Sequence, residues 1–69
     1  MQIRAYQKGE LAQMYYPWCG KRHALRSFNK DVTHCHRLSK DLRRMGWTSQ
    51  RRVLTERMVH LIIRALGEP

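Results

Sequence analysis

The stretch YYPWCGKRHAL, residues 15–25, decides how the first half of the chain is expected to fold. A proline pushes the residue before it out of helical geometry, so a helix that reaches Tyr16 is expected to end there. The turn Trp18-Cys19-Gly20 follows, and the basic pair Lys21 and Arg22 opens a second helix. Two interpretations compete. The stretch is either a turn that presents a basic helix to a phosphate backbone, or half of a metal site.

The chain before this turn predicts a short strand and a short helix. Residues 2–6 alternate in character, with Ile3 and Ala5 on one face, which is the pattern of a strand with an inward face. Lys8 ends this pattern. Residues 10–16 then carry apolar side chains four positions apart, as one face of a helix does.

The chain after the turn predicts a second helix over residues 21–29. Its inner face holds Ala24, Leu25 and Phe28. Its outer face holds Arg22, Arg26 and Asn29. A helix, a tight turn containing glycine and a helix with a polar outer stripe make up the helix-turn-helix pattern. A helical hairpin with a solvated basic face would show the same pattern.

A third helix is expected over residues 34–45, after a break at residues 30–33 in which Thr33 caps it. Gly46 stands where a helix C-terminus favours a left-handed residue. Trp47 is expected to fold back and cover the core.

The last third of the chain predicts a strand and the clearest helix. Residues 51–54 are expected to pair with the N-terminal strand, and Thr55 to cap a final helix. That helix has a regular apolar stripe closed by a glycine: Val59, Ile62, Ile63, Leu66 and Gly67. The predicted fold is mostly α: a compact helix-turn-helix-like single domain over residues 1–69, with four helices and a short two-stranded β ribbon.

The charge balance narrows the classes of partner. Fourteen Lys and Arg residues stand against five Asp and Glu, which gives a net charge of +9. Such a field attracts polyanions, so nucleic acid is the leading partner, followed by an anionic membrane surface and an acidic protein. No apolar run approaches the roughly 20 residues of a membrane span, and no signal-like segment follows Met1. We therefore expect a cytoplasmic protein whose Cys19 and Cys35 are reduced thiols.

The cations cluster in the middle of the chain and define a candidate DNA-binding surface. Arg22 and Arg26, one helical turn apart, are placed to reach base edges or phosphates in a major groove. Lys21 lies near a helix N-terminus, where backbone N–H groups also attract phosphate. The full candidate set is Lys21, Arg22, His23, Arg26, Asn29, Lys30, Arg37, Lys40, Arg43, Arg44, Arg51 and Arg52.

The metal interpretation fits the residue spacing less well. A zinc site needs about four converging Cys or His ligands, usually in two closely spaced pairs. Cys19 and His23 are four apart, and His34, Cys35 and His36 cluster later, but the adjacent His34 and Cys35 would point in different directions from a regular helix. We predict no metal and no cofactor. A chain this short also offers little room for a substrate cleft and an oxyanion hole, so we predict no enzymatic activity.

Two segments resemble a known family. ELAQMYYP contributes Glu10, Leu11, Ala12, Tyr16 and Pro17, and the closing segment RRVLTERMVHLIIRALGEP contributes Thr55, Val59, Ile62, Leu66, Gly67 and Pro69. Both are similar to a family of small Bacteroides-type helical proteins of unknown function. Its layout is similar to excisionase-like and MerR-like helix-turn-helix domains. The resemblance implies a DNA-binding fold in a mobile-element or phage setting and no catalytic activity. The chain departs from the family at Cys19, Gly20 and His23, in and after the turn that aims the second helix.

The sequence thus predicts a small regulatory or accessory protein that binds double-stranded DNA. A protein-interaction adaptor or inhibitor, with its cations facing an acidic partner, is the alternative. Binding to a membrane surface is less favoured, because the apolar stripes are spaced for mutual burial and are broken by turns. Whether the chain forms a homodimer stays open.

Overall fold

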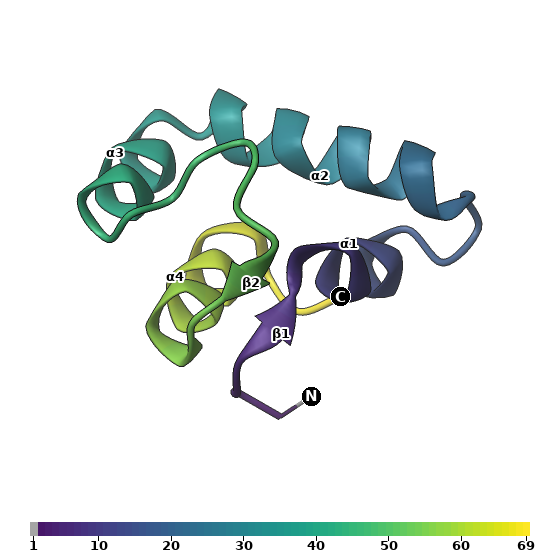
Figure 1. The fold of residues 1–69 in the computed structure, drawn as a ribbon, viewed down its shortest axis with the longest axis horizontal. Helices are drawn as coiled ribbons and strands as arrows, with labels where there is room; N and C mark the ends of the chain where they lie inside the picture. Colours follow the sequence, from purple (N-terminus) through teal and green to yellow (C-terminus); the bar gives the residue numbers. More distant parts are fainter. Residues whose placement is uncertain (1) are drawn as a thin grey trace.

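A computed structural model describes residues 2–69, which fold into four helices and a two-stranded antiparallel ribbon. The elements are β1 (Tyr6–Gln7), α1 (Lys8–Tyr15), α2 (Lys21–His34), α3 (His36–Arg44), β2 (Val53–Leu54) and α4 (Glu56–Leu66). The predicted mostly helical fold with a short ribbon is confirmed. The molecule measures 30 × 23 × 20 Å, and α2, the longest helix, runs along one side of it (Figure 1).

The core lies between α2 and the elements that face it. In Figure 1, α1 and α4 lie below α2, and α3 turns away from its end. Leu11, Phe28, Leu42, Leu54 and Ile62 are fully buried and come from five different elements. Burying a large apolar side chain stabilises a fold by about 1.5–3 kcal/mol, so this shared cluster holds short elements that would be marginal in isolation.

The helix α2 is longer than predicted. The expected break at residues 30–33 is absent: α2 continues to His34, because Val32 extends the buried stripe begun by Ala24 and Phe28. Thr33 therefore lies inside the helix, where its hydroxyl donates to the Asn29 carbonyl, and it caps nothing. A single residue, Cys35, separates α2 from α3.

The ribbon is shorter than predicted, and its inward face is the opposite one. Tyr6 pairs with Leu54, and Gln7 pairs with Val53. Tyr6 is 5% exposed, whereas Ile3 is 38% exposed, so the prediction that Ile3 faces inward was wrong. An aromatic ring buries more area than the shorter chain of Ile3, which accounts for the choice of face.

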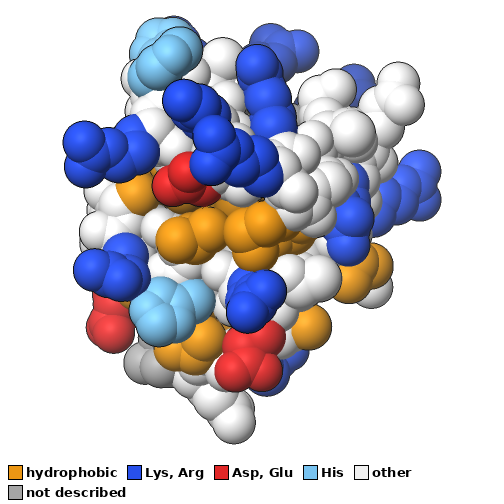
Figure 2. All heavy atoms as spheres, turned by 90° about the vertical axis from the view of Figure 1, so that its left-hand side faces the viewer, with side chains coloured by type: hydrophobic (Ala, Val, Ile, Leu, Met, Phe, Trp, Pro, Cys, Tyr) orange, Lys and Arg blue, Asp and Glu red, His pale blue; other side chains and the backbone are white. Residues whose placement is uncertain are grey.

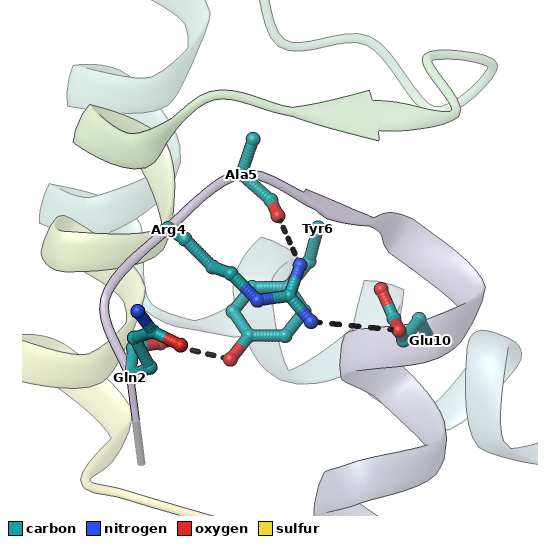
Figure 3. Close-up of polar contacts among 5 residues, drawn as sticks. All are labelled: Gln2, Arg4, Ala5, Tyr6 and Glu10. Carbon is teal, nitrogen blue, oxygen red and sulfur yellow. Dashed lines mark hydrogen bonds and ion pairs between the residues drawn. The ribbon is translucent and has the colours of Figure 1, made fainter.

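The N-terminal segment is tied to α1 by the side chains drawn in Figure 3. The Arg4 guanidinium lies 3.9 Å from the centre of the Tyr6 ring and 3.8 Å from a Glu10 carboxylate oxygen. The Tyr6 hydroxyl donates to the Gln2 carbonyl. These contacts hold β1 in position for its pairing with β2.

The ends of α3 and the start of α4 follow the sequence signals. Gly46 has φ +94°, and the Trp47 amide donates to the Leu42 carbonyl, which is the pattern of a glycine-terminated helix. Trp47 is partly buried against the core, as predicted, with its ring centroid 6.3 Å from that of Phe28. The Thr55 hydroxyl accepts a hydrogen bond from the Met58 amide and so caps α4.

Candidate nucleic-acid interface

The cations of the molecule are concentrated on two helices. Eight of the fourteen Lys and Arg residues lie on α2 and α3, and all eight are exposed. They are Lys21, Arg22, Arg26, Lys30, Arg37, Lys40, Arg43 and Arg44. Figure 2 shows the side of the molecule formed by α3 and α4, where Lys and Arg side chains surround a central strip of hydrophobic side chains.

The outer face of α2 carries a continuous basic row. Arg22, Arg26 and Lys30 follow one another at intervals of four residues, so they lie one above the other on one side of the helix. The buried stripe faces the other way, and His23 is exposed beside the row. Asn29 departs from the prediction because it is only partly exposed, and its Oδ1 is buried without a hydrogen-bond partner in the described residues.

A second basic row lies on α3. His36, Lys40 and Arg43 share one face of this helix, and together with Thr33 of α2 they line a hollow of about 620 Å³. The hollow lies at the junction of α2 and α3, because only one residue separates these helices. Arg44 also lines this hollow, and Arg37, the remaining predicted cation of α3, is exposed.

The two arginines after α3 have different environments. The Arg51 Nε donates to the Val53 carbonyl over 2.7 Å, and its Nη1 lies 3.4 Å from the Gly46 carbonyl oxygen. Arg51 is therefore engaged in holding its own loop. Arg52 is exposed and forms no side-chain hydrogen bond within residues 2–69. Of the predicted pair, Arg52 is thus the one available to a partner.

Two carboxylates, Asp31 and Asp41, lie on the helices that carry the basic surface. Within the described part of the chain, the one ion pair joins Arg4 and Glu10, both outside α2 and α3. Asp31, on α2, accepts a hydrogen bond from the Tyr16 hydroxyl, which raises the pKa of that phenol. This bond also anchors the turn after α1 to the side of α2. The eight cations of α2 and α3 thus form no ion pair within the described part of the chain, although Asp41 lies on α3 among them.

The turn between α1 and α2 is held by a side chain of α1. The Gln13 side-chain amide donates to the carbonyls of Tyr16 and Cys19, over 3.1 and 2.7 Å. The connection over residues 16–20 therefore has a fixed shape, as a helix-turn-helix arrangement would need. Trp18, at its tip, is 77% exposed.

The cysteine and histidine residues do not converge. Residues 2–69 contain no group of three or more His, Cys, Asp or Glu side chains placed to hold a metal ion. Cys19 and Cys35 are free thiols at opposite ends of α2, a helix of 14 residues that is about 20 Å long at 1.5 Å per residue. That separation prevents the two thiols from sharing a metal ion or forming a disulfide with each other.

Comparison with known proteins places the chain in a family. Residues 2–69 match the family described as a domain of unknown function (DUF4248). The chain belongs to this family. No curated protein matches it, and no solved structure does. None of its described helices combines the length and the apolar character that crossing a membrane requires.

Two features of the structure were not predicted from the sequence. Lys8 is only 3% exposed: its ammonium donates to the carbonyls of Thr48 and Ser49 and lies 4.2 Å from the centre of the Trp47 ring. Burial lowers the pKa of this ammonium. The sequence around Lys8 does not predict this burial, because the partners of the ammonium are 40 and 41 residues away.

The second feature is a smaller basic patch on α4. Arg57, His60 and Arg64 line a hollow of about 310 Å³ together with Met45 and Leu61. The spacing of three and four residues between these side chains places them on one helical face, and the sequence alone could have predicted this arrangement.

Proposed function

We propose that this protein is a non-enzymatic DNA-binding protein that holds double-stranded DNA against the outer faces of α2 and α3. One observation carries the proposal: eight exposed cations lie on two adjacent helices, and no carboxylate in residues 2–69 pairs with any of them. Phosphates would supply the missing anions, and each phosphate neutralised releases counterions from the DNA.

The arrangement of α1, turn and α2 favours a particular way of docking. In a helix-turn-helix protein the second helix enters the major groove, and its exposed side chains contact base edges. Arg22 and Arg26 occupy such positions on α2, and arginine is the common bidentate partner of guanine. The α3 cations would then contact the phosphate backbone beside the groove.

A small regulatory or accessory role, in a mobile element or a phage, fits this interpretation. The free thiols Cys19 and Cys35 are compatible with a reducing, cytoplasmic setting. A homodimer would double the contact with DNA, since one small domain by itself usually binds a single half-site.

The test is a binding titration with a short duplex of random sequence at low ionic strength. The parent chain is compared with Arg22→Glu/Arg26→Glu and with Arg57→Glu/Arg64→Glu, a control that changes the net charge equally but on α4. We expect the α2 variant to lose at least about tenfold in affinity, because each arginine contact is worth about 1–3 kcal/mol. The α4 variant should lose much less.

Two results would contradict the proposal. A parent chain that does not bind duplex DNA at low salt would remove DNA as the partner. Equal losses in the two variants would show that net charge, and not the α2 surface, drives binding.

A second candidate function is binding to an acidic protein, as an adaptor or inhibitor. The observation that favours it is the α4 hollow, whose lining combines apolar Met45 and Leu61 with Arg57 and Arg64. Such a combination suits an acidic segment with a hydrophobic anchor more than it suits a phosphate backbone. This function would be the better one if the parent chain fails to bind DNA.

A further inference from the structure

A third hollow, of about 470 Å³, is formed by three segments that are far apart in the sequence. It is lined by residues 7–9 at the start of α1, by Lys21 and Leu25 of α2, and by residues 49–52 of the loop before β2. These segments meet only in the folded chain, so no local sequence motif predicts the hollow. It lies beside the N-terminal end of α2, where the proposed DNA-binding face begins.

The lining of this hollow is strongly basic. Four cations contribute to it, namely Lys8, Lys21, Arg51 and Arg52, and no Asp or Glu does. Polar groups of Gln7, Ser49 and Gln50 complete it. A cluster of four cations without an acid is costly to assemble, since each cation raises the energy of its neighbours.

The cations of the hollow divide into two that hold the structure and two that are free. The Lys8 ammonium donates to the carbonyls of Thr48 and Ser49 over 2.9 and 3.2 Å. The backbone amide of Lys8 donates to the Arg52 carbonyl over 2.6 Å. Arg51 bonds the carbonyls of its own loop. These contacts fix the loop and with it the origin of the Arg52 side chain.

Lys21 and Arg52 have exposed side chains without a partner in the described residues. Lys21 reaches the hollow because its chain crosses over Gly9: a Cβ at residue 9 would lie 3.0 Å from the Lys21 Cε. The lack of a side chain at Gly9 thus leaves the path by which Lys21 approaches the start of α1.

We propose that this hollow is a binding site for one phosphate group, held by Lys21 and Arg52. The inference rests on the proposed function for the source of the phosphate, which is the DNA backbone next to the N-terminal end of α2. Arg52 supplies planar paired donors, Lys21 supplies a point charge, and Ser49 is among the residues that line the hollow. Lys8 and Arg51 act as positioning residues.

The first experiment measures how duplex binding depends on salt between about 50 and 200 mM. Removing one phosphate contact lowers the slope of log K against log salt by about 1. We expect this change in Lys21→Gln/Arg52→Gln and not in Arg57→Gln/Arg64→Gln, which removes the same charge from α4. An equal change of slope in both variants would overturn the site.

A charge-neutral variant separates geometry from net charge. Gly9→Ala keeps every cation but places a Cβ 3.0 Å from the Lys21 Cε, so that the end of this side chain has to shift slightly, whereas Gly20→Ala is a control, because a Cβ at residue 20 meets no atom within 4 Å. Gly9→Ala should bind more weakly than the parent and more tightly than Lys21→Gln/Arg52→Gln. Binding equal to that of Gly20→Ala would contradict the role of Lys21 in this hollow.

A second experiment does not depend on DNA. In a titration of the parent chain with inorganic phosphate, followed by the NMR shifts of backbone amides, changes should gather at Gly9, Lys21 and residues 49–52. Changes gathered on α3, or spread evenly over the basic surface, would overturn the proposal. Specific shifts in a chain that does not bind duplex DNA would keep the phosphate site and refute the proposed function.

The source of the phosphate is tested with two blunt duplexes that differ only in their 5′ ends. Equal affinity for ends carrying a hydroxyl or a phosphate is expected if the site takes a backbone phosphate. Tighter binding of the phosphorylated duplex, lost in Lys21→Gln/Arg52→Gln, would overturn the backbone source and assign the hollow to strand ends.

Discussion

The loop around Lys8 and the outer face of α2 show two uses of the same kind of charge. The Lys8 ammonium has two carbonyl partners and an aromatic ring, and only 3% of the residue is exposed. Arg22, Arg26 and Lys30 are exposed and have no side-chain partner in residues 2–69. We term the first region, residues 47–52 with Lys8, the pinned loop, and its contacts stabilise the fold. The α2 row makes no stabilising side-chain contact of this kind.

The α2 row in fact opposes folding. Like charges four residues apart on a helix destabilise it by about 0.2–0.5 kcal/mol per pair, and the row contains two such pairs. A fold of this size has only a few kcal/mol to spare. Binding to a partner therefore explains these uncompensated charges better than a contribution to stability does. The comparison predicts that mutations in the loop around Lys8 lower stability, whereas mutations in the α2 row weaken binding.

The two tryptophans give the largest expected contrast. Trp47→Ala should cost about 3 kcal/mol of unfolding free energy, because the ring packs against Phe28 and the Lys8 ammonium. Trp18→Ala should cost less than about 0.5 kcal/mol, since its ring is 77% exposed and contacts chiefly Tyr16. Urea denaturation of both variants measures the difference. Similar losses would mean that the pinned loop contributes no more than the surface turn.

Much of the fold could be predicted because its signals are local. The Thr55 cap, the glycine at residue 46 and the apolar stripe of α4 act within a few residues of each other, so spacing alone reveals them. The basic surface could be predicted for a similar reason, since exposed helical faces follow from the periodicity of the buried residues.

What sequence reasoning missed depends on contacts between distant residues. Residues 30–33 read as a break, yet Val32 meets the core formed by other helices and so keeps α2 continuous. Lys8 read as the end of a strand, whereas its partners Thr48 and Ser49 lie 40 and 41 residues further on. Tertiary burial overrode the local preference in both places.

A sharper test of the comparison replaces one cation in each region by methionine, an unbranched and uncharged side chain that keeps most of the aliphatic stem. Lys8→Met should cost about 2 kcal/mol, because hydrogen bonds to a charged group are worth about 1.5–3 kcal/mol and the carbonyls of Thr48 and Ser49 lose their donor. Arg26→Met should change stability by less than about 0.5 kcal/mol and weaken DNA binding. If Arg26→Met were the more destabilising of the two, the division between structural and free cations would be wrong.

The smallest expected effect concerns a second stabilising contact, between Tyr15 and Gly67, which we term the C-terminal pin. The Tyr15 hydroxyl donates to the Gly67 carbonyl and so holds the segment after α4 against α1. Burial, helped by the negative charge of Glu68, raises the pKa of Tyr15 to about 12 from its usual 10.0. The unfolded chain therefore releases this proton at a lower pH than the folded chain does.

The sign of the pH effect follows from that order. The contribution of Tyr15 to stability is complete below about pH 10 and is lost as the pH rises toward 12, because the folded state then holds more protons than the unfolded state. The test compares the urea midpoint at about pH 9 with that at about pH 11. The decrease should be larger in the parent than in Tyr15→Phe, because the phenylalanine has no phenol proton to lose. The difference between the two falls cancels the contributions of Tyr16 and Lys8, whose pKa values also shift but are common to both chains. An equal fall in the two chains would show that the C-terminal pin does not depend on the protonated phenol.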